Sequence, residues 1–143
     1  NIPVCPFLDK ELKQDQLYID IWYPTDNSFM DLMESFLLSS KNSALIVCPN
    51  THTIDYSEVS RKTIQSQITD LLRKNPNTDY LKCMIFSPYE DFEVAGVKTR
   101  SNAPYFLINV APTKQLGKSH KDLQKTKYFQ NFTDDEKKRL NVK

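Results

Sequence analysis

Four apolar segments of this chain each end at a proline. They close with Trp22-Tyr23-Pro24, Val47-Cys48-Pro49, Phe86-Ser87-Pro88 and Val110-Ala111-Pro112. Proline has no backbone N–H and cannot donate to a β ladder, so each of these prolines marks the end of a strand. The spacing of the four segments therefore predicts a sheet built from short strands that are widely separated in sequence.

Helical patterns separate the first three of these strands. Apolar residues recur at helical spacing over residues 27–38 and again over residues 64–72, where a variant of the capping box at 55–58 opens the second helix. The run 44–48 is apolar throughout, which is typical of a strand covered on both faces. Segments 92–99 and 105–110 are predicted to form a further pair of strands.

The resulting order of elements, βαβαβββα, predicts an α/β fold in a single domain. Parallel strands need crossover connections, and these are most often helices, so we expect a mixed, mainly parallel five-stranded sheet flanked by helices. If 92–99 is a hairpin return, the other strands all point the same way. The four prolines Pro24, Pro49, Pro88 and Pro112 would then lie along one edge of the sheet.

Charge is distributed unevenly along the chain, whose net charge is +1. Residues 1–112 carry 10 basic and 14 acidic side chains, whereas residues 113–143 carry 9 basic and 4 acidic ones. We expect 1–112 to form an α/β core and 113–143 to form a basic helical segment docked on it. Helix-start signatures lie at Ser119-x-x-Asp122 and Thr133-x-x-Glu136. The candidate interaction residues of this segment are Leu123, Lys125, Lys127, Tyr128, Phe129 and Phe132.

Polar residues follow the strand-ending prolines. Ligands of open α/β sheets bind outside the carboxyl ends of the parallel strands, where carboxylates and an imidazole could act as acid, base or metal ligand. The candidates for such an enzyme are Asp26, His52, Asp55, Glu90 and Asp91. The competing interpretation is structural, because Asp26 and Asp55 also suit helix capping and loops are polar in general. On that interpretation we expect no bound metal and no cofactor.

Glycine is scarce, with only Gly96 and Gly117 in the chain. A dinucleotide-binding loop with three glycines is therefore excluded. Gly117-Lys118-Ser119 ends like a phosphate-binding loop, but Pro112 occupies the position of its first glycine, so an NTPase is rejected. A weaker anion site at a helix start remains a hypothesis, with Lys114, Lys118 and Ser119 as its residues.

Two polar residues interrupt apolar strands. Asp20 lies between Ile19 and Ile21, and Asn109 lies between Ile108 and Val110. A buried polar group needs a partner, so we expect both residues on a solvated or edge face rather than in the core. The alternative is that they form a polar feature of an interface.

Cysteine usage and hydropathy indicate the cellular compartment in which the chain is expected to lie. The chain has three cysteines, and Cys48 and Cys83 lie within apolar strand-like runs, where a thiol behaves as a small hydrophobe. No apolar run approaches the roughly 20 residues that cross a bilayer. We expect reduced thiols, no membrane span and an intracellular location, cytoplasmic or nuclear.

These patterns favour binding over catalysis. We expect a noncatalytic protein–protein interaction domain, a docking or scaffold subunit of a larger intracellular protein or complex, which contacts its partner through a sheet edge or the C-terminal segment. One alternative is a small metal-dependent hydrolase or phosphate-binding enzyme that uses the post-strand loops. Another is an RNA-binding or other nucleic-acid-binding domain, because aromatic residues and lysines alternate near residue 128. A convergent cleft would favour an enzyme, and an exposed apolar patch would favour docking.

Overall fold

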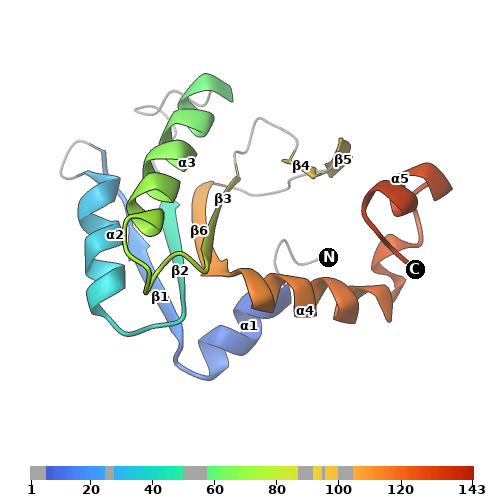
Figure 1. Cartoon of the computed structure of the whole chain (residues 1–143), viewed down its shortest axis with the longest axis horizontal. Helices are drawn as coiled ribbons and strands as arrows, with labels where there is room; N and C mark the ends of the chain where they lie inside the picture. The colour runs from blue at the N-terminus through green and yellow to red at the C-terminus, as the bar shows by residue number, and fades with distance from the viewer. Residues whose placement is uncertain (1–5, 25–27, 50–57, 87–91, 95, 100–104) are drawn as a thin grey trace.

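The computed structural model describes residues 6–24, 28–49, 58–86, 92–94, 96–99 and 105–143 (Figure 1). The first elements are α1 (Pro6–Lys13), β1 (Leu17–Ile21), α2 (Phe29–Leu38), β2 (Ser43–Cys48), α3 (Glu58–Arg73) and β3 (Leu81–Phe86). The later ones are β4 (Phe92–Val94), β5 (Val97–Thr99), β6 (Phe106–Pro112), α4 (Thr113–Gln124), the 3₁₀ turn η1 (Lys127–Phe129) and α5 (Asp134–Arg139). The predicted α/β fold is confirmed.

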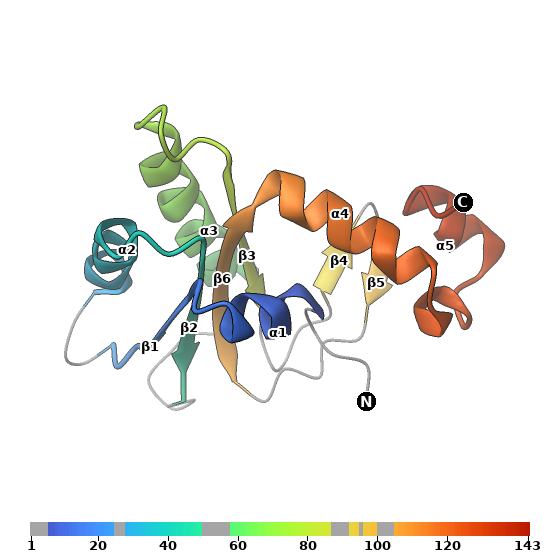
Figure 2. The same cartoon turned by 90° about the horizontal axis from the view of Figure 1, so that it is seen from below.

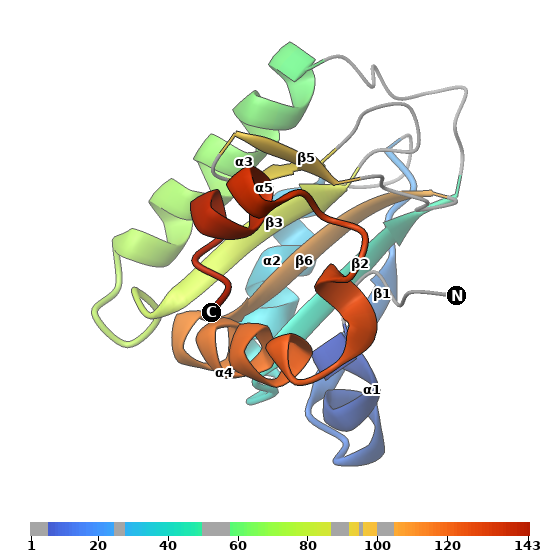
Figure 3. The same cartoon turned by 90° about the vertical axis from the view of Figure 1, so that its right-hand side faces the viewer.

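Among the described residues, the main sheet has four strands in the order β1-β2-β6-β3 (Figure 3). Strand β1 is parallel to β2, while β6 is antiparallel to both of its neighbours. The two inner positions belong to β2 and β6, the strands with the most continuous burial. Strands β4 and β5 pair with each other in a small hairpin, and neither pairs with another strand of the described ranges. The predicted sheet of five mainly parallel strands is therefore not confirmed; the main sheet is mixed and smaller.

The expected direction of the last strand is wrong. Pro24 and Pro49 follow the ends of β1 and β2, but Pro112 pairs with Leu81, the first residue of β3, and so lies at the opposite end of the sheet. Pro88 lies outside the described residues. The physical reason is the antiparallel pairing of Val94 with Val97, which Gly96 permits with its φ of 76°. Segment 92–99 is thus a hairpin outside the main sheet, and the chain enters β6 from the far end.

One face of the sheet carries the main core. Cross-strand rows such as Ala44–Val110–Cys83 and Ile46–Ile108–Ile85 are almost fully buried there. Helices α2 and α3 lie on this face, on the opposite side of the sheet from α1 and α4 (Figure 2). The predicted helical spacings place these helix residues in the core cluster: Leu32, Met33, Phe36, Ile64, Ile68 and Leu72. Burying side chains of this size stabilises the fold by about 1.5–3 kcal/mol each.

The other face is covered by α1 and α4 over part of its area (Figure 2). Helix α1 was not expected from the sequence, although Pro6 is its first residue, a position that suits proline because no helical N–H bond is lost there. Helix α4 begins at Thr113, six residues before the expected start at Ser119, and that expectation is wrong. The two helices contact each other, and α4 also contacts β6.

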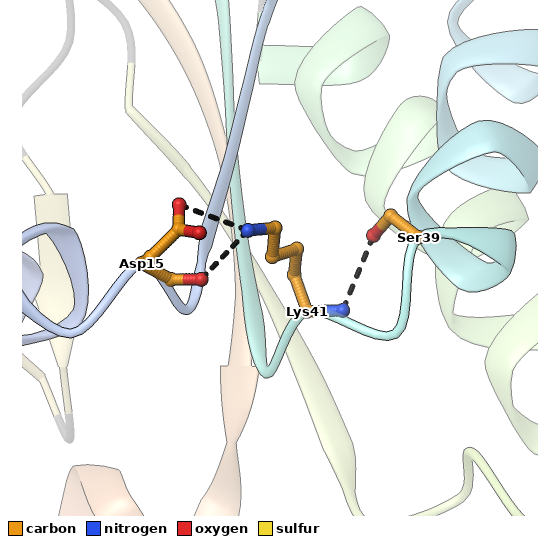
Figure 4. Close-up of polar contacts among 3 residues, drawn as sticks. All are labelled: Asp15, Ser39 and Lys41. Carbon is orange, nitrogen blue, oxygen red and sulfur yellow. Dashed lines mark hydrogen bonds and ion pairs between the residues drawn. The ribbon is translucent and has the colours of Figure 1, made fainter.

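A polar clip joins the loops that precede β1 and β2 (Figure 4). Asp15 closes α1 in a left-handed conformation with φ of 54°, and Gln16 N–H donates to the carbonyl of Glu11 in the usual helix-terminating pattern. Lys41 Nζ lies 2.9 Å from Asp15 Oδ1 and donates to the Asp15 carbonyl at 2.7 Å. Lys41 N–H also donates to Ser39 Oγ, at the end of α2.

Substitutions of the two glycines by alanine should change the free energy of unfolding in opposite directions. Gly117 is exposed inside α4, and a Cβ there would meet nothing within 4 Å, so Gly117→Ala should raise the free energy of unfolding by about 1 kcal/mol. Gly96→Ala should lower it by about 1 kcal/mol, because φ at Gly96 is positive. Urea denaturation of both variants measures this. A destabilised Gly117→Ala protein would contradict a continuous helix through residue 117.

Candidate functional site

The residues proposed for an enzyme, Asp26, His52, Asp55, Glu90 and Asp91, all lie outside the described residues. Their mutual geometry therefore stays a prediction. Within the part of the chain that the structure describes, no group of three or more His, Cys, Asp or Glu residues could hold a metal ion. No described helix is both long and apolar enough to cross a membrane.

The anion candidates all lie on α4, with Lys114 in its first turn and Lys118 and Ser119 in its interior. Lys118 and Ser119 line a pocket of about 230 Å³, together with Lys10 of α1, whereas Lys114 is not among its lining residues. The pocket also contains the carboxylate of Asp122. A hydrogen bond and charge attraction from Lys125 lower the pKa of Asp122, and Lys118 and Lys10 add to the effect. The lysines of this pocket thus already face an anionic group of the chain itself.

The candidate interaction residues of the C-terminal segment pack largely against one another. Phe129 is buried, and its ring lies 4.9 Å from that of Tyr128 and 5.4 Å from that of Phe132, measured between centroids. His120 of α4 contacts Phe129 edge to face at 5.6 Å. We call these four residues the aromatic cluster. Leu123 is half-buried, while Lys125 and Lys127 are exposed.

Contact between the segment and the rest of the molecule involves other residues. Gln115 of α4 donates from Nε2 to Oε1 of the buried Glu11 in α1. Arg139 of α5 approaches the turn at Gly96, since its Nη1 would lie 3.4 Å from a Cβ at that position. Thr133 and Glu136 form the predicted capping box of α5. Docking of the segment through Leu123, Tyr128, Phe129 and Phe132 remains a prediction.

An exposed apolar strip, absent from the predicted site residues, lies on β1. Its members are Ile19, Ile21 and Tyr23, which are 50%, 47% and 43% exposed. Ile19 and Ile21 share the sheet face of Leu17, since side chains alternate along a strand. Leu17 and its neighbour in the row, Ser43, are buried at the end of the sheet near α1. The apolar strip therefore begins where this cover ends, and we call it the β1 strip.

The backbone of β1 is also open to pairing. Strand β1 is the outermost strand of the sheet, with β2 on one side and, among the described residues, no strand on the other (Figure 3). Trp22 N–H donates to the Val47 carbonyl at 2.8 Å. Backbone groups alternate in direction along a strand, so the amides of Leu17, Ile19 and Ile21 point away from β2.

Asp20 modifies this open edge. Its Oδ1 accepts a 2.8 Å hydrogen bond from Ile21 N–H, and its Oδ2 accepts one of 2.8 Å from the hydroxyl of Tyr18. Partial burial and then the Asp20 carboxylate raise the pKa of Tyr18, so the hydroxyl remains a donor at neutral pH. Asp20 lies on the edge strand β1, as expected from the sequence. The same expectation is wrong for Asn109, which is buried in the inner strand β6.

The predicted reduced thiols are confirmed for two cysteines. Cys48 and Cys83 are buried and form no disulfide, while Cys5 lies outside the described residues. Burial raises the pKa of the Cys83 thiol to about 12. A thiol that stays protonated is a poor nucleophile, so Cys83 acts as a small apolar side chain of the core.

The raised pKa of Cys83 predicts a loss of stability in alkali. An unfolded thiol ionises near pH 8.5, so its burial favours the folded state fully below that pH, and the gain is lost as pH rises toward about 12. Between pH 8 and about pH 10.5, wild type should lose roughly 2 kcal/mol more unfolding free energy than Cys83→Ala. Urea denaturation at both pH values tests this, and equal losses in the two proteins would contradict it.

The aromatic cluster predicts local stability in the C-terminal segment. Phe129→Ala should lower the opening free energy of amides in α4 by about 3 kcal/mol, because it removes a buried ring at the centre of the cluster. Native-state hydrogen exchange measures this. Lys127→Ala, two residues away and exposed, is the matched control and should change the value by less than about 0.5 kcal/mol. Similar effects of the two substitutions would contradict a structural role for the Phe129 ring.

Comparisons with known proteins supply no relative from which a site could be transferred. No protein-family model, curated protein or solved structure matches this chain. Any binding property of the chain must therefore be inferred from its own residues. Among the described residues, the β1 strip lies beside backbone groups that point away from the sheet.

Proposed function

We propose that this chain is a noncatalytic protein-binding domain whose binding site is the outer edge of β1. One observation carries the proposal: the edge strand presents the β1 strip beside backbone groups that point away from the sheet. An exposed apolar edge strand is a template for pairing with another chain. The partner chemistry that fits is an extended segment with apolar side chains on one face.

Two contributions to the binding free energy would favour such a complex. The first is backbone hydrogen bonding to Leu17 and Ile19, which supplies affinity without regard to the partner's sequence. The second is burial of the exposed half of Ile19 and of Ile21, which contributes about 1 kcal/mol for each side chain. The apolar side chains also provide specificity, because only a partner with apolar residues at alternate positions would cover them.

The two edges of the sheet differ in what they offer. The opposite edge strand, β3, carries the exposed Lys82 in its interior, and a charged side chain on an edge discourages pairing with another chain. Strand β1 carries neither lysine nor proline, and its one charged residue, Asp20, is half-buried and accepts hydrogen bonds from Tyr18 and Ile21 of the same strand. The C-terminal segment is a weaker candidate, because its aromatic residues are already in contact with one another. These differences favour β1 as the binding edge.

Affinity capture from the cells that make this chain tests the proposal. Wild-type protein should retain a stoichiometric partner, and the double variant Ile19→Lys with Ile21→Lys should lose it, because two charges would have to be buried beside the partner strand. Both positions are about half exposed, so the unbound domain should keep its fold, which circular dichroism verifies.

Leu38→Lys is the matched control for a general loss of surface hydrophobicity. Leu38 is 86% exposed at the end of α2, on the opposite side of the sheet from the β1 strip, and the control should retain the same partner as wild type. A partner that binds the double variant as well as it binds wild type would contradict the proposed site.

A further inference from the structure

We infer that β1 is self-complementary and pairs with β1 of a second copy of this chain, antiparallel about a two-fold axis at Ile19. This inference rests on the proposed function, because it names the occupant of the same edge. The evidence is the order of side chains along the strand, Leu17-Tyr18-Ile19-Asp20-Ile21, together with the direction of its backbone amides.

The geometry of the edge sets the direction of pairing. Two identical edges that face each other in one sheet are related by a two-fold axis, which makes the strands antiparallel. The outward amides belong to the odd-numbered residues of β1, so odd residues must pair with odd residues of the second copy. Only a few registers satisfy this condition.

The register centred on Ile19 matches the chemistry of every pair in the strand. Ile19 faces Ile19 of the second copy, and Leu17 faces Ile21 of the second copy, so apolar side chains meet along one face. On the other face, Tyr18 lies opposite Asp20 of the second copy. That pair lies between hydrogen-bonded pairs, where Cα atoms are only about 4.5 Å apart, so a hydroxyl donor meets a carboxylate acceptor.

The neighbouring registers place less compatible side chains opposite each other. Centring on Asp20 would place two carboxylates directly opposite each other, and like charges at that position are destabilising. Centring on Tyr18 would leave Ile21 opposite Asp15, the exposed carboxylate of the loop before β1. The register at Ile19 is also the only one in which all five residues of β1 overlap.

A hydrogen bond of Asp20 within the single chain competes with this pairing. In the single chain, its Oδ1 accepts from Ile21 N–H, the donor that the second copy needs. Pairing requires Asp20 to release this donor to the Leu17 carbonyl of the second copy, and it requires each Tyr18 hydroxyl to exchange the Asp20 of its own chain for that of the second copy. The exchange conserves hydrogen bonds, so the gain comes mainly from the newly buried apolar strip. With five residues per strand, we expect a small, reversible interface.

The product would be a continuous eight-stranded sheet with β1 of each copy at its centre. A two-fold axis perpendicular to the sheet leaves α2 and α3 of both copies on the same side, and α1 and α4 of both copies on the other side. Strand β3 would then form both outer edges, where Lys82 discourages further growth. The assembly therefore closes at two copies.

Sedimentation analysis of the full chain tests the inference through a charge exchange at Ile19. Wild type should show a concentration-dependent shift from one to two copies, with a dissociation constant below about 1 mM. Ile19→Lys alone and Ile19→Glu alone should each stay monomeric, because the axis places like charges opposite each other. An equal mixture of the two variants should recover the dimer, because lysine then faces glutamate.

Each outcome separates the inference from the proposed function. Wild type that stays monomeric at about 1 mM, or a mixture that does not recover the dimer, would overturn pairing centred on Ile19. If affinity capture nevertheless yields a partner that depends on Ile19 and Ile21, the edge binds a different protein and the proposed function stands. Ile21→Lys with Ile21→Glu is the matched control mixture, and it should not recover the dimer, because residue 21 faces Leu17 rather than itself.

Discussion

The insertion of β6 between β2 and β3 is the interaction on which the rest of this molecule depends. Residues 108–111 of β6 are fully buried, and the strand pairs along its length with both neighbours. Because β6 occupies an inner position, the earliest strand, β1, remains at the margin, with β2 as its one neighbouring strand in the part of the chain that the structure describes. Because β6 runs against β2 and β3, α4 starts at the end of the sheet where β1, β2 and β3 begin. The placement of one late strand thus determines both the open edge and the position of the C-terminal helices.

Local patterns predicted the elements well. The helix over 27–38 became Phe29–Leu38, the apolar run 44–48 became an inner strand, and Thr133 with Glu136 capped α5. Each of these signals acts within a few residues: helical periodicity, continuous hydrophobicity and a reciprocal cap. The coarse α/β class followed from their order.

Strand direction could not be predicted in the same way, because it depended on a single residue. Gly96 lies within an apolar stretch that otherwise looks like one strand, and its positive φ turns that stretch into a separate hairpin. An isolated glycine in a strand pattern is the available signal for such a turn. The early start of α4 had a similar cause: Gly117 weakened the helical pattern, although the preceding Pro112 suits the residue before a helix. The β1 strip was missed because exposure depends on which strands end at the margin, a property of the whole sheet.

The clip between Asp15 and Lys41 has a consequence for the character of the β1 surface. It joins the loops before two adjacent parallel strands and so favours a pairing in which Leu17 lies beside Ser43. If β1 slipped by one residue, every side chain of the strand would change face. The two isoleucines would turn toward the α2 side, and Tyr18 and Asp20 would take their place on the open side. The ion pair between Asp15 and Lys41, although of modest strength, therefore helps to determine whether the outer edge of this sheet is apolar or polar.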